Sequence, residues 1–323
     1  MKHLITKEKI PGYSLNESQA GYEFWTGEDA IPVIYSTNQL LEESVYKRIP
    51  FPENQTALIQ TAVVPAMTES KKFNLKSIFH EIVCQLPESK DTQLQICALS
   101  DGYEITAEND IELMLTIDKA QKEDLFAASF FVENLKPRED MYISIENQSN
   151  LLTAEQHEYA NHNKHFTYLL GVSKNQKQIK ITLGKGSYRL HNIKFFTGSW
   201  ENLKQTGLCQ HPFIPESMQW KTKWNGIGYT KGTILAEPNS YLITSIPFDD
   251  GFSIYIDGKK VKTEVVNTAF LGCKLPNGKH QVEIKYKAKG FQTGVCTTVI
   301  GTICCMLLLI TKNGPRKAKA RIR

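Results

Sequence analysis

Several histidines come close together in one polar stretch of the sequence. His157-Glu158 are followed by His162 and His165. A helical zinc-protease motif needs two histidines four residues apart, so that both face one ion. His157 and His162 are five residues apart. We therefore interpret residues 153–165 as a solvated polar loop or short helix, and we predict no metal site.

A pair of aspartates offers a second candidate chemistry. Asp249-Asp250 resemble the paired acids that hold a metal-bound nucleotide sugar, but Gly251 follows them and a strand pattern begins directly afterwards. Asp and Gly at such a position favour a turn. The chain also contains no Walker loop, no G-x-G-x-x-G motif and no G-x-S-x-G motif. We therefore predict no cofactor and assign no catalytic residue.

Large aromatic residues gather between two β-rich stretches. They are Trp200, Trp220, Trp224 and Tyr229. Aromatic rings can stack on the C–H faces of sugars, although large aromatic residues more often fill cores and domain interfaces. These four residues are the candidate glycan contacts of the sequence, with a structural role as the alternative.

The strongest single signal is an apolar segment near the end of the chain. Residues 291–310 contain no Asp, Glu, Lys, Arg or His. Twenty helical residues span about 30 Å, the thickness of the hydrocarbon core of a bilayer. We predict a transmembrane helix over residues 291–311, with the lipid bilayer as a partner. A buried helix of a soluble core is the alternative.

The charges around this segment predict its orientation. Residues 312–323 carry six Lys and Arg residues and no acid. Basic residues favour the cytoplasmic side, so residues 1–290 are expected to be extracytoplasmic. The chain has a net charge of +4, and without the six basic residues the net charge of the rest is −2. A nearly neutral exterior part gives no reason to predict nucleic-acid binding.

The first residues do not show an export signal. Residues 1–18 have no apolar run and no small-residue cleavage site. We expect that an upstream membrane region is missing from this chain and that it would export residues 1–290. The alternative is a cytoplasmic tail-anchored protein with a short lumenal tip, against which the basic tail argues.

Cysteine usage predicts little covalent cross-linking. Cys84, Cys97, Cys209 and Cys273 lie before the apolar segment, and no C-x-x-C motif occurs. Four scattered thiols do not make a disulfide framework. We interpret them as small buried side chains and leave one disulfide open.

The chain before the apolar segment is predicted to be mainly β. Residues 1–70 read as a small mixed α/β lead-in, with a strand over residues 32–37 and helices over residues 37–49 and 52–64. Residues 71–214 contain short alternating strands, which favour a β-sandwich or jelly roll. Residues 215–290 form a second, smaller β domain. Residues 312–323 are the basic tail.

Two turn signals organise the smaller β domain. Asp257-Gly258 and Asn277-Gly278 are dipeptides typical of two-residue hairpins. Alternating apolar residues place 252, 254 and 256 on one face of a strand, and 282, 284 and 286 on one face of the last strand. This last strand leads almost directly into the apolar segment. The domain is therefore expected to lie on the bilayer surface.

The order of these motifs resembles one family. The last part of the chain is similar to the C-terminal end of the YfhO family of bacterial polytopic membrane proteins. The similar features, in order, are a strand ending at Pro247, Asp250-Gly251-Phe252, the 257–261 hairpin, Ala269-Phe270-Leu271-Gly272, the 275–280 turn and the last strand. Residues 22–37 and 51–64 are also similar to it. The chain departs from the family at Phe252, where members commonly have Trp. The resemblance covers about half of the chain.

This resemblance implies a function that the motifs alone do not. In this family, many membrane helices of the GT-C glycosyltransferase type are followed by an extracytoplasmic β-rich part and a last helix. It implies transfer of sugar from an undecaprenyl-phosphate donor to lipoteichoic acid or another polymer of the cell envelope. The catalytic acids of such enzymes lie in early loops that are absent here. This chain is therefore expected to be inactive alone and to contact cell-wall polymer or lipid-linked sugar. The alternative is a stand-alone membrane-anchored module that binds glycans or a protein.

Overall fold

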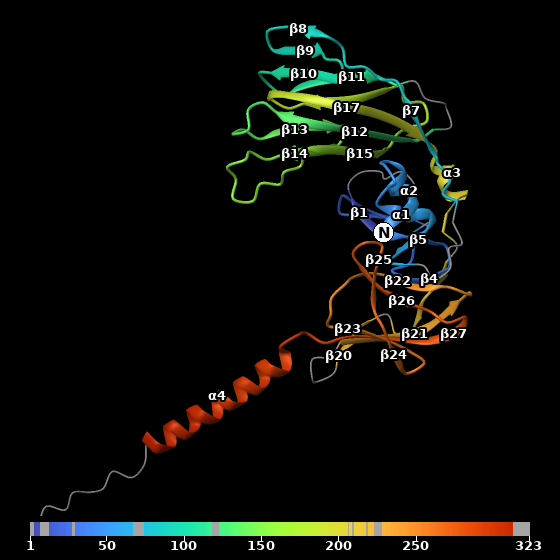
Figure 1. Cartoon of the computed structure of the whole chain (residues 1–323), viewed down its shortest axis with the longest axis vertical. Helices are drawn as coiled ribbons and strands as arrows, with labels where there is room; N and C mark the ends of the chain where they lie inside the picture. The colour runs from blue at the N-terminus through green and yellow to red at the C-terminus, as the bar shows by residue number, and fades with distance from the viewer. Residues whose placement is uncertain are drawn as a thin grey trace, which may run out of the picture. The chain divides into compact units, whose positions relative to one another are not determined.

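A computed structural model describes residues 3–6, 13–27, 30–66, 74–117, 123–205, 207–208, 210–217, 219–222 and 228–312. Strands dominate its regular structure (Figure 1), so the prediction of a mainly β fold is confirmed. The chain forms two compact units. The N-terminal unit comprises Met1–Ile31 and Gln39–Cys209, and the C-terminal unit comprises Pro32–Asn38 and Gln210–Arg323.

The N-terminal unit contains a sandwich of two antiparallel sheets. The larger sheet consists of β7 (Phe79–Ile82), β8 (Ser89–Lys90), β9 (Leu94–Ala98), β10 (Gly102–Ala107), β12 (Leu125–Asn134), β15 (His165–Gly171) and β17 (Gly186–Gly198). Its order is β15-β12-β17-β10-β9-β8, and β7 also pairs with β17. The smaller sheet consists of β11 (Ile111–Thr116), β13 (Met141–Ile145), β14 (Gln148–Leu152) and β16 (Gln178–Leu183), in the order β11-β16-β13-β14.

Alternating apolar residues from both sheets form the core of this sandwich. In β16, Ile179, Ile181 and Leu183 are buried, as their period of two predicts. Hydrogen bonds also join the two sheets. The buried one is donated by the Tyr168 hydroxyl of β15 to the Ile143 carbonyl of β13 at 2.7 Å. Burial therefore fixes which face of each strand is free to meet a ligand.

The remaining elements of the N-terminal unit are short. β1 (His3–Thr6), β2 (Ser14–Gln19) and β3 (Tyr22–Thr26) form a separate antiparallel sheet, and β5 (Leu40–Glu42) pairs in parallel with β6 (Ala62–Val64). The helices are α1 (Glu43–Tyr46), α2 (Glu53–Gln60) and α3 (Trp200–Gln205).

The predicted helix over residues 37–49 is wrong in its first half. Leu40 and Leu41 lie in β5, and only four residues of the segment form α1. The two leucines are buried because β5 pairs with β6, which brings Leu41 opposite Val63. A partner strand twenty residues away thus overrides the local helical spacing. The second predicted helix is confirmed in part as α2, which begins directly after Pro52 and ends before β6.

The C-terminal unit is a second sandwich of two sheets. One sheet has the order β18-β4-β22-β26-β25, and the other has the order β19-β21-β27-β23-β24 with β20 paired to β21. The bounds are β4 (Ile34–Thr37), β18 (His211–Pro212), β19 (Ile214–Pro215), β20 (Lys221–Thr222), β21 (Gly228–Ala236), β22 (Tyr241–Pro247), β23 (Phe252–Ile256), β24 (Lys259–Val261), β25 (Glu264–Val266), β26 (Phe270–Lys274) and β27 (Gly278–Tyr286). Both sheets contribute to one buried core.

Residues 32–38 belong to this unit although they precede most of the N-terminal unit in sequence. They supply β4, in which Ser36 lies opposite Leu242 of β22. The domain boundary predicted from the sequence, at residue 70, groups this strand with the lead-in segment 1–70. The backbone groups along β22 need a neighbour, and β4 provides it.

The two turn signals have different outcomes. Asp257 and Gly258 have φ angles of 50° and 80° and join β23 to β24 as the predicted hairpin. The prediction of a hairpin at Asn277-Gly278 is wrong, because β26 and β27 belong to different sheets. That turn crosses from one sheet of the sandwich to the other.

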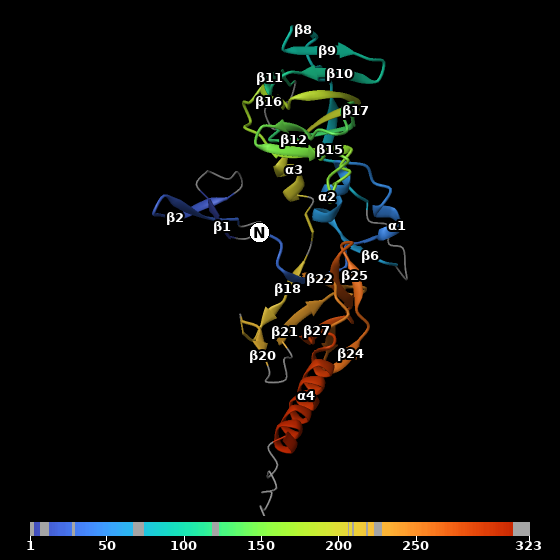
Figure 2. The same ribbon diagram turned by 90° about the vertical axis from the view of Figure 1, so that its left-hand side faces the viewer.

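The apolar segment forms one long helix, α4 (Phe291–Lys312), continuous in both views (Figures 1 and 2). Phe291–Leu309 is long and apolar enough to cross a membrane. The hydroxyls of Thr297, Thr298 and Thr302 each donate to the carbonyl four residues earlier at 2.8 Å. These three hydroxyls are thus satisfied within the helix, which suits them to an apolar environment. The tail residues 313–323 lie outside the described residues.

Candidate functional site

The predicted aromatic contacts are distributed over both units. Trp200 begins α3 in the N-terminal unit and packs against a buried cluster that includes Phe196 and Leu203. Trp220 and Tyr229 lie in the C-terminal unit, and Trp220 is 45% exposed. Trp224 lies outside the described residues. Trp200 therefore contributes to packing, and glycan contact stays a prediction for all four residues.

The histidines of the polar stretch have separate partners. His157 Nε2 lies 3.1 Å from Asp140 Oδ1, and His165 Nε2 lies 2.8 Å from Ser129 Oγ. Within the described residues, no three His, Cys, Asp or Glu side chains are placed to hold a metal ion. The aspartate pair forms the predicted turn, because Asp249 Oδ1 accepts a hydrogen bond from the Gly251 N–H at 2.7 Å.

A row of three rings crosses the outer face of the larger N-terminal sheet. Phe131 of β12 lies opposite His165 of β15 on one side and His191 of β17 on the other. The Phe131 and His165 rings are stacked, with centroids 4.4 Å apart and planes 11° apart. Phe131 is 45% exposed, although its neighbour Phe130 is buried. We call His165, Phe131 and His191 the ring row.

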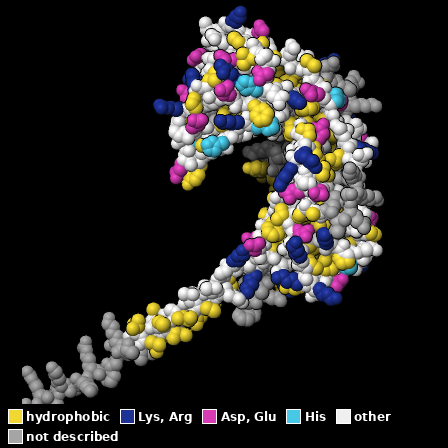
Figure 3. All heavy atoms as spheres, viewed as in Figure 1, with side chains coloured by type: hydrophobic (Ala, Val, Ile, Leu, Met, Phe, Trp, Pro, Cys, Tyr) yellow, Lys and Arg dark blue, Asp and Glu magenta, His cyan; other side chains and the backbone are white. Residues whose placement is uncertain are grey.

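Charged side chains of both signs surround the ring row. Arg189 Nε lies 2.8 Å from Glu104 and its Nη1 lies 3.5 Å from Glu133. His191 Nδ1 lies 3.1 Å from Asp101. Figure 3 shows histidines and charged side chains of both signs gathered beside hydrophobic ones on this unit. The ion pairs hold donors and acceptors in fixed places next to the exposed ring.

The ring row combines apolar ring surface with charged neighbours. Partial burial lowers the pKa of His165 from its ordinary value of 6.5, so its ring is neutral at pH 7 and stacks on Phe131 without a desolvated charge. Apolar ring surface beside carboxylates and a guanidinium can bind a sugar, whose C–H faces pack on rings while its hydroxyls form hydrogen bonds.

A polar loop leads directly into the ring row. Residues 153–164 connect β14 to β15 and form the loop that the sequence predicts. Asn161 holds one part of the loop: its Nδ2 donates to the Leu151 carbonyl at 2.8 Å, and its Oδ1 accepts from the Thr153 N–H at 3.2 Å. We call residues 153–164 the pinned loop.

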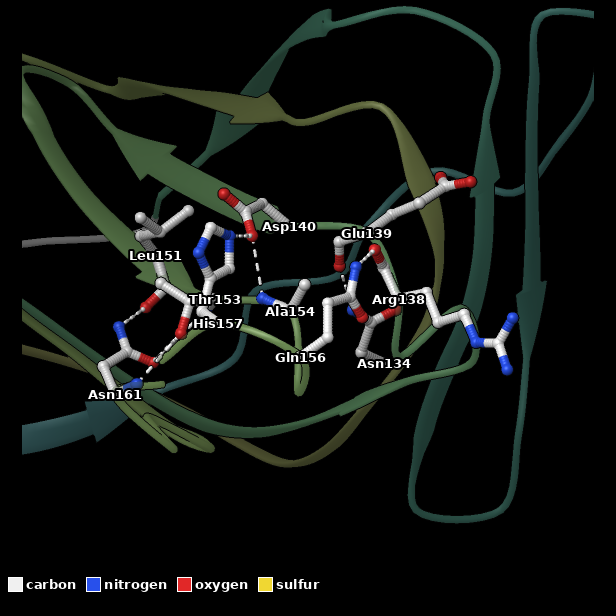
Figure 4. Close-up of polar contacts among 10 residues, drawn as sticks. All are labelled: Asn134, Arg138, Glu139, Asp140, Leu151, Thr153, Ala154, Gln156, His157 and Asn161. Carbon is white, nitrogen blue, oxygen red and sulfur yellow. Dashed lines mark hydrogen bonds and ion pairs between the residues drawn. The ribbon is translucent and has the colours of Figure 1, made fainter. Parts of the chain in front are cut away.

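A second set of contacts holds the pinned loop near its start. Asp140 Oδ1 accepts from the Ala154 N–H at 2.7 Å and contacts His157, and Gln156 Nε2 donates to the Arg138 carbonyl at 2.6 Å. Figure 4 shows both sets of contacts. Between them the loop presents Tyr159, which is 86% exposed. The loop is thus an ordered connection that exposes an aromatic side chain.

Comparison with known proteins gives the chain a family. It is 18% identical over 320 residues to the uncharacterized protein YfhO of Bacillus subtilis (strain 168), covering 97% of this chain and 35% of that protein. The chain therefore spans about a third of this relative. The family described as bacterial membrane protein YfhO matches residues 1–298. Together with the apolar helix α4, this match fits a membrane location, and the chain belongs to the YfhO family of bacterial membrane proteins.

Proposed function

We propose that this chain is the extracytoplasmic, non-catalytic part of a YfhO-type membrane glycosyltransferase. The larger protein would transfer sugar from an undecaprenyl-phosphate-linked donor to lipoteichoic acid or another cell-surface polymer. The observation that carries the proposal is the family match over residues 1–298 in a chain that spans 35% of its relative. The described residues fold as β sandwiches with one apolar helix. Catalysis is therefore assigned to the rest of the larger protein.

Within this function, the ring row is proposed to hold the acceptor polymer. Phe131 offers exposed apolar surface to sugar rings. Arg189 offers a guanidinium to phosphate groups, and Glu104 and Glu133 offer acceptors to hydroxyls. Binding on a rigid sheet would keep an acceptor near the membrane-bound active site. This raises the effective concentration of the acceptor without adding a catalytic group.

The second candidate is a membrane-anchored module that binds glycans or a protein on its own. The exposed rings of Phe131 and Tyr159 favour it, because both are available without any further part of a larger protein. The two candidates differ in one respect: only the first requires the chain to be joined to a catalytic membrane region.

A chimera tests the proposed function. The region of Bacillus subtilis YfhO that corresponds to this chain is deleted, and in a second strain it is replaced by residues 1–323. We expect the deletion to abolish sugar on purified lipoteichoic acid and the chimera to restore it, while the chain alone adds none. The readout is the sugar content of the polymer by mass spectrometry.

The outcomes of this experiment separate the two parts of the proposal. Full sugar transfer after the deletion would show that this region is dispensable. An intact relative that adds no sugar to any envelope polymer would contradict the transferase assignment itself. Restoration by a chimera with Phe131→Ala as efficient as by the unchanged chain would contradict acceptor binding on the ring row.

Two cysteines test the proposed orientation. Cys97 is exposed, whereas Cys273 is fully buried and burial raises the pKa of its thiol to about 12. A thiolate is the reactive form. We expect a membrane-impermeant maleimide to modify Cys97 in intact protoplasts and Cys273 only after denaturation. Peptide mass spectrometry reads each site. Modification of Cys97 only after lysis would place residues 1–290 in the cytoplasm.

A further inference from the structure

Three aromatic side chains meet at one end of the C-terminal sandwich. Phe252 and Tyr286 are cross-strand partners at the ends of β23 and β27, with ring centroids 4.6 Å apart. Trp220 meets Phe252 edge-on at 6.5 Å. Gly228, the first residue of β21, lies opposite Tyr286. We call Trp220, Phe252 and Tyr286 the aromatic end; Trp220 remains 45% exposed there.

The chain between the aromatic end and α4 is short, and it is bonded to the turn that precedes β23. The Lys287 N–H donates to the Gly251 carbonyl at 3.0 Å, and Lys289 Nζ lies 2.5 Å from Asp250. Gly290 then takes a positive φ of 78°, and α4 begins at Phe291. Five residues lead from Tyr286 to Phe291, which span at most about 17 Å when fully extended. The chain also turns within this step, because the Phe291 N–H donates to the Ala288 carbonyl at 3.3 Å. The aromatic end and the start of the apolar helix are therefore neighbours, whatever the direction of the helix.

We propose that the aromatic end contacts the head-group layer of the bilayer, with the exposed Trp220 ring inserted at that depth. The head-group layer is about 5–8 Å thick on each side of the hydrocarbon core. A strand end this close to the first membrane residue lies within or beside it. Trp and Tyr concentrate at this depth, since their rings have an apolar body and a polar edge.

The charges at this end fit an anionic lipid surface. Lys221, Lys285, Lys287 and Lys289 lie on the strand ends and the linker. Three acids lie among these lysines: Asp250 pairs with Lys289, Glu283 pairs with Lys285 at 2.9 Å, and Asp249 acts on Lys289 electrostatically. Four lysines and three acids leave a net charge of 4 − 3 = +1 at this end. Lysine side chains near a membrane surface are attracted by anionic lipids. This proposal is independent of the transferase activity.

Depth-dependent fluorescence quenching tests the proposal on the full chain. Trp25, Trp200 and Trp224 are replaced by Phe, so that only Trp220 remains. The chain is reconstituted in phosphatidylglycerol–phosphatidylcholine vesicles with a nitroxide on the head group or near the end of the acyl chain. We expect strong quenching of Trp220 by the head-group nitroxide and little quenching by the deep one.

A matched control moves the indole to the other end of the same sheet. It carries Trp220→Phe and Leu235→Trp in the same background. Leu235 is 49% exposed, close to the exposure of Trp220. It lies seven residues beyond Gly228 on β21, roughly 23 Å along the strand. We expect several-fold weaker quenching at position 235. Equal quenching at both positions, or none at position 220, would overturn the proposal.

A second measurement removes the dependence on the triple replacement. The otherwise unchanged chain is compared with Trp220→Phe alone, in the same vesicles. The variant should lose part of the fluorescence that the head-group nitroxide quenches. An unchanged quenchable fraction would mean that Trp220 does not contact lipid. Such a result would favour another protein segment as the cover of the aromatic end.

Discussion

Phe130→Ala is expected to lower the free energy of unfolding of the N-terminal sandwich by about 3–5 kcal/mol, the usual cost of removing a buried aromatic ring. Phe130 is 1% exposed. Its ring lies 6.0 Å from Phe166 and 5.8 Å from Tyr168. The cavity would loosen β15, because both neighbours belong to it. Hydrogen–deuterium exchange of the β12 and β15 amides measures the effect.

The next residue provides the control for this prediction. Phe131→Ala removes a ring from the opposite face of the same strand, where it is 45% exposed. Its cost is expected to be about 0.5–1.5 kcal/mol, since the substitution mainly removes the stack on His165. Equal protection of the amides in the two variants would contradict the assigned faces of β12. Phe131→Ala should instead reduce retention of the chain on immobilised lipoteichoic acid.

Local sequence pattern predicted the strands better than their partners. The buried face of β16, and the shared face of 282 and 284 in β27, follow from alternation. The Asp257-Gly258 hairpin follows from the positive φ angles that these residues tolerate. Alternation, however, does not state which strand a given strand pairs with. The return of β4 to the C-terminal unit and the parallel β5–β6 pair are decided by distant segments.

The candidate site shows the same limit more sharply. The composition of residues 153–164 predicts a polar loop, and His165 directly after it is one of the histidines considered as metal ligands. Phe131 and His191 carry no local signal, because each belongs to an ordinary alternating strand. Only the antiparallel register places them beside His165. The register between β12 and β17 also shifts at a bulge between Ser129 and Phe131. The spacing of residues in the sequence does not predict this bulge.

Gly102→Ala is expected to destabilise the N-terminal sandwich by about 2–3 kcal/mol, at the upper end of the cost of overpacking. A Cβ atom at Gly102 would lie 1.8 Å from the Leu190 carbonyl oxygen. This oxygen belongs to backbone and cannot move aside as a side-chain tip does. β17 is held between β10 and β12 at this point, since Leu190 lies opposite both Tyr103 and Val132. The two strands must therefore separate.

The same substitution should also displace His191 of the ring row, because Gly102 lies opposite His191. Displacing β10 would also lengthen the contact of His191 with Asp101, now 3.1 Å. We expect Gly102→Ala to raise exchange of the β10 and β17 amides and to weaken binding to lipoteichoic acid together. Gly228→Ala is the control: its Cβ would meet only Trp220, at 3.7 Å, an ordinary contact. Exchange as slow in Gly102→Ala as in this control would contradict the close approach of β10 and β17, and with it the placement of His191 in the ring row.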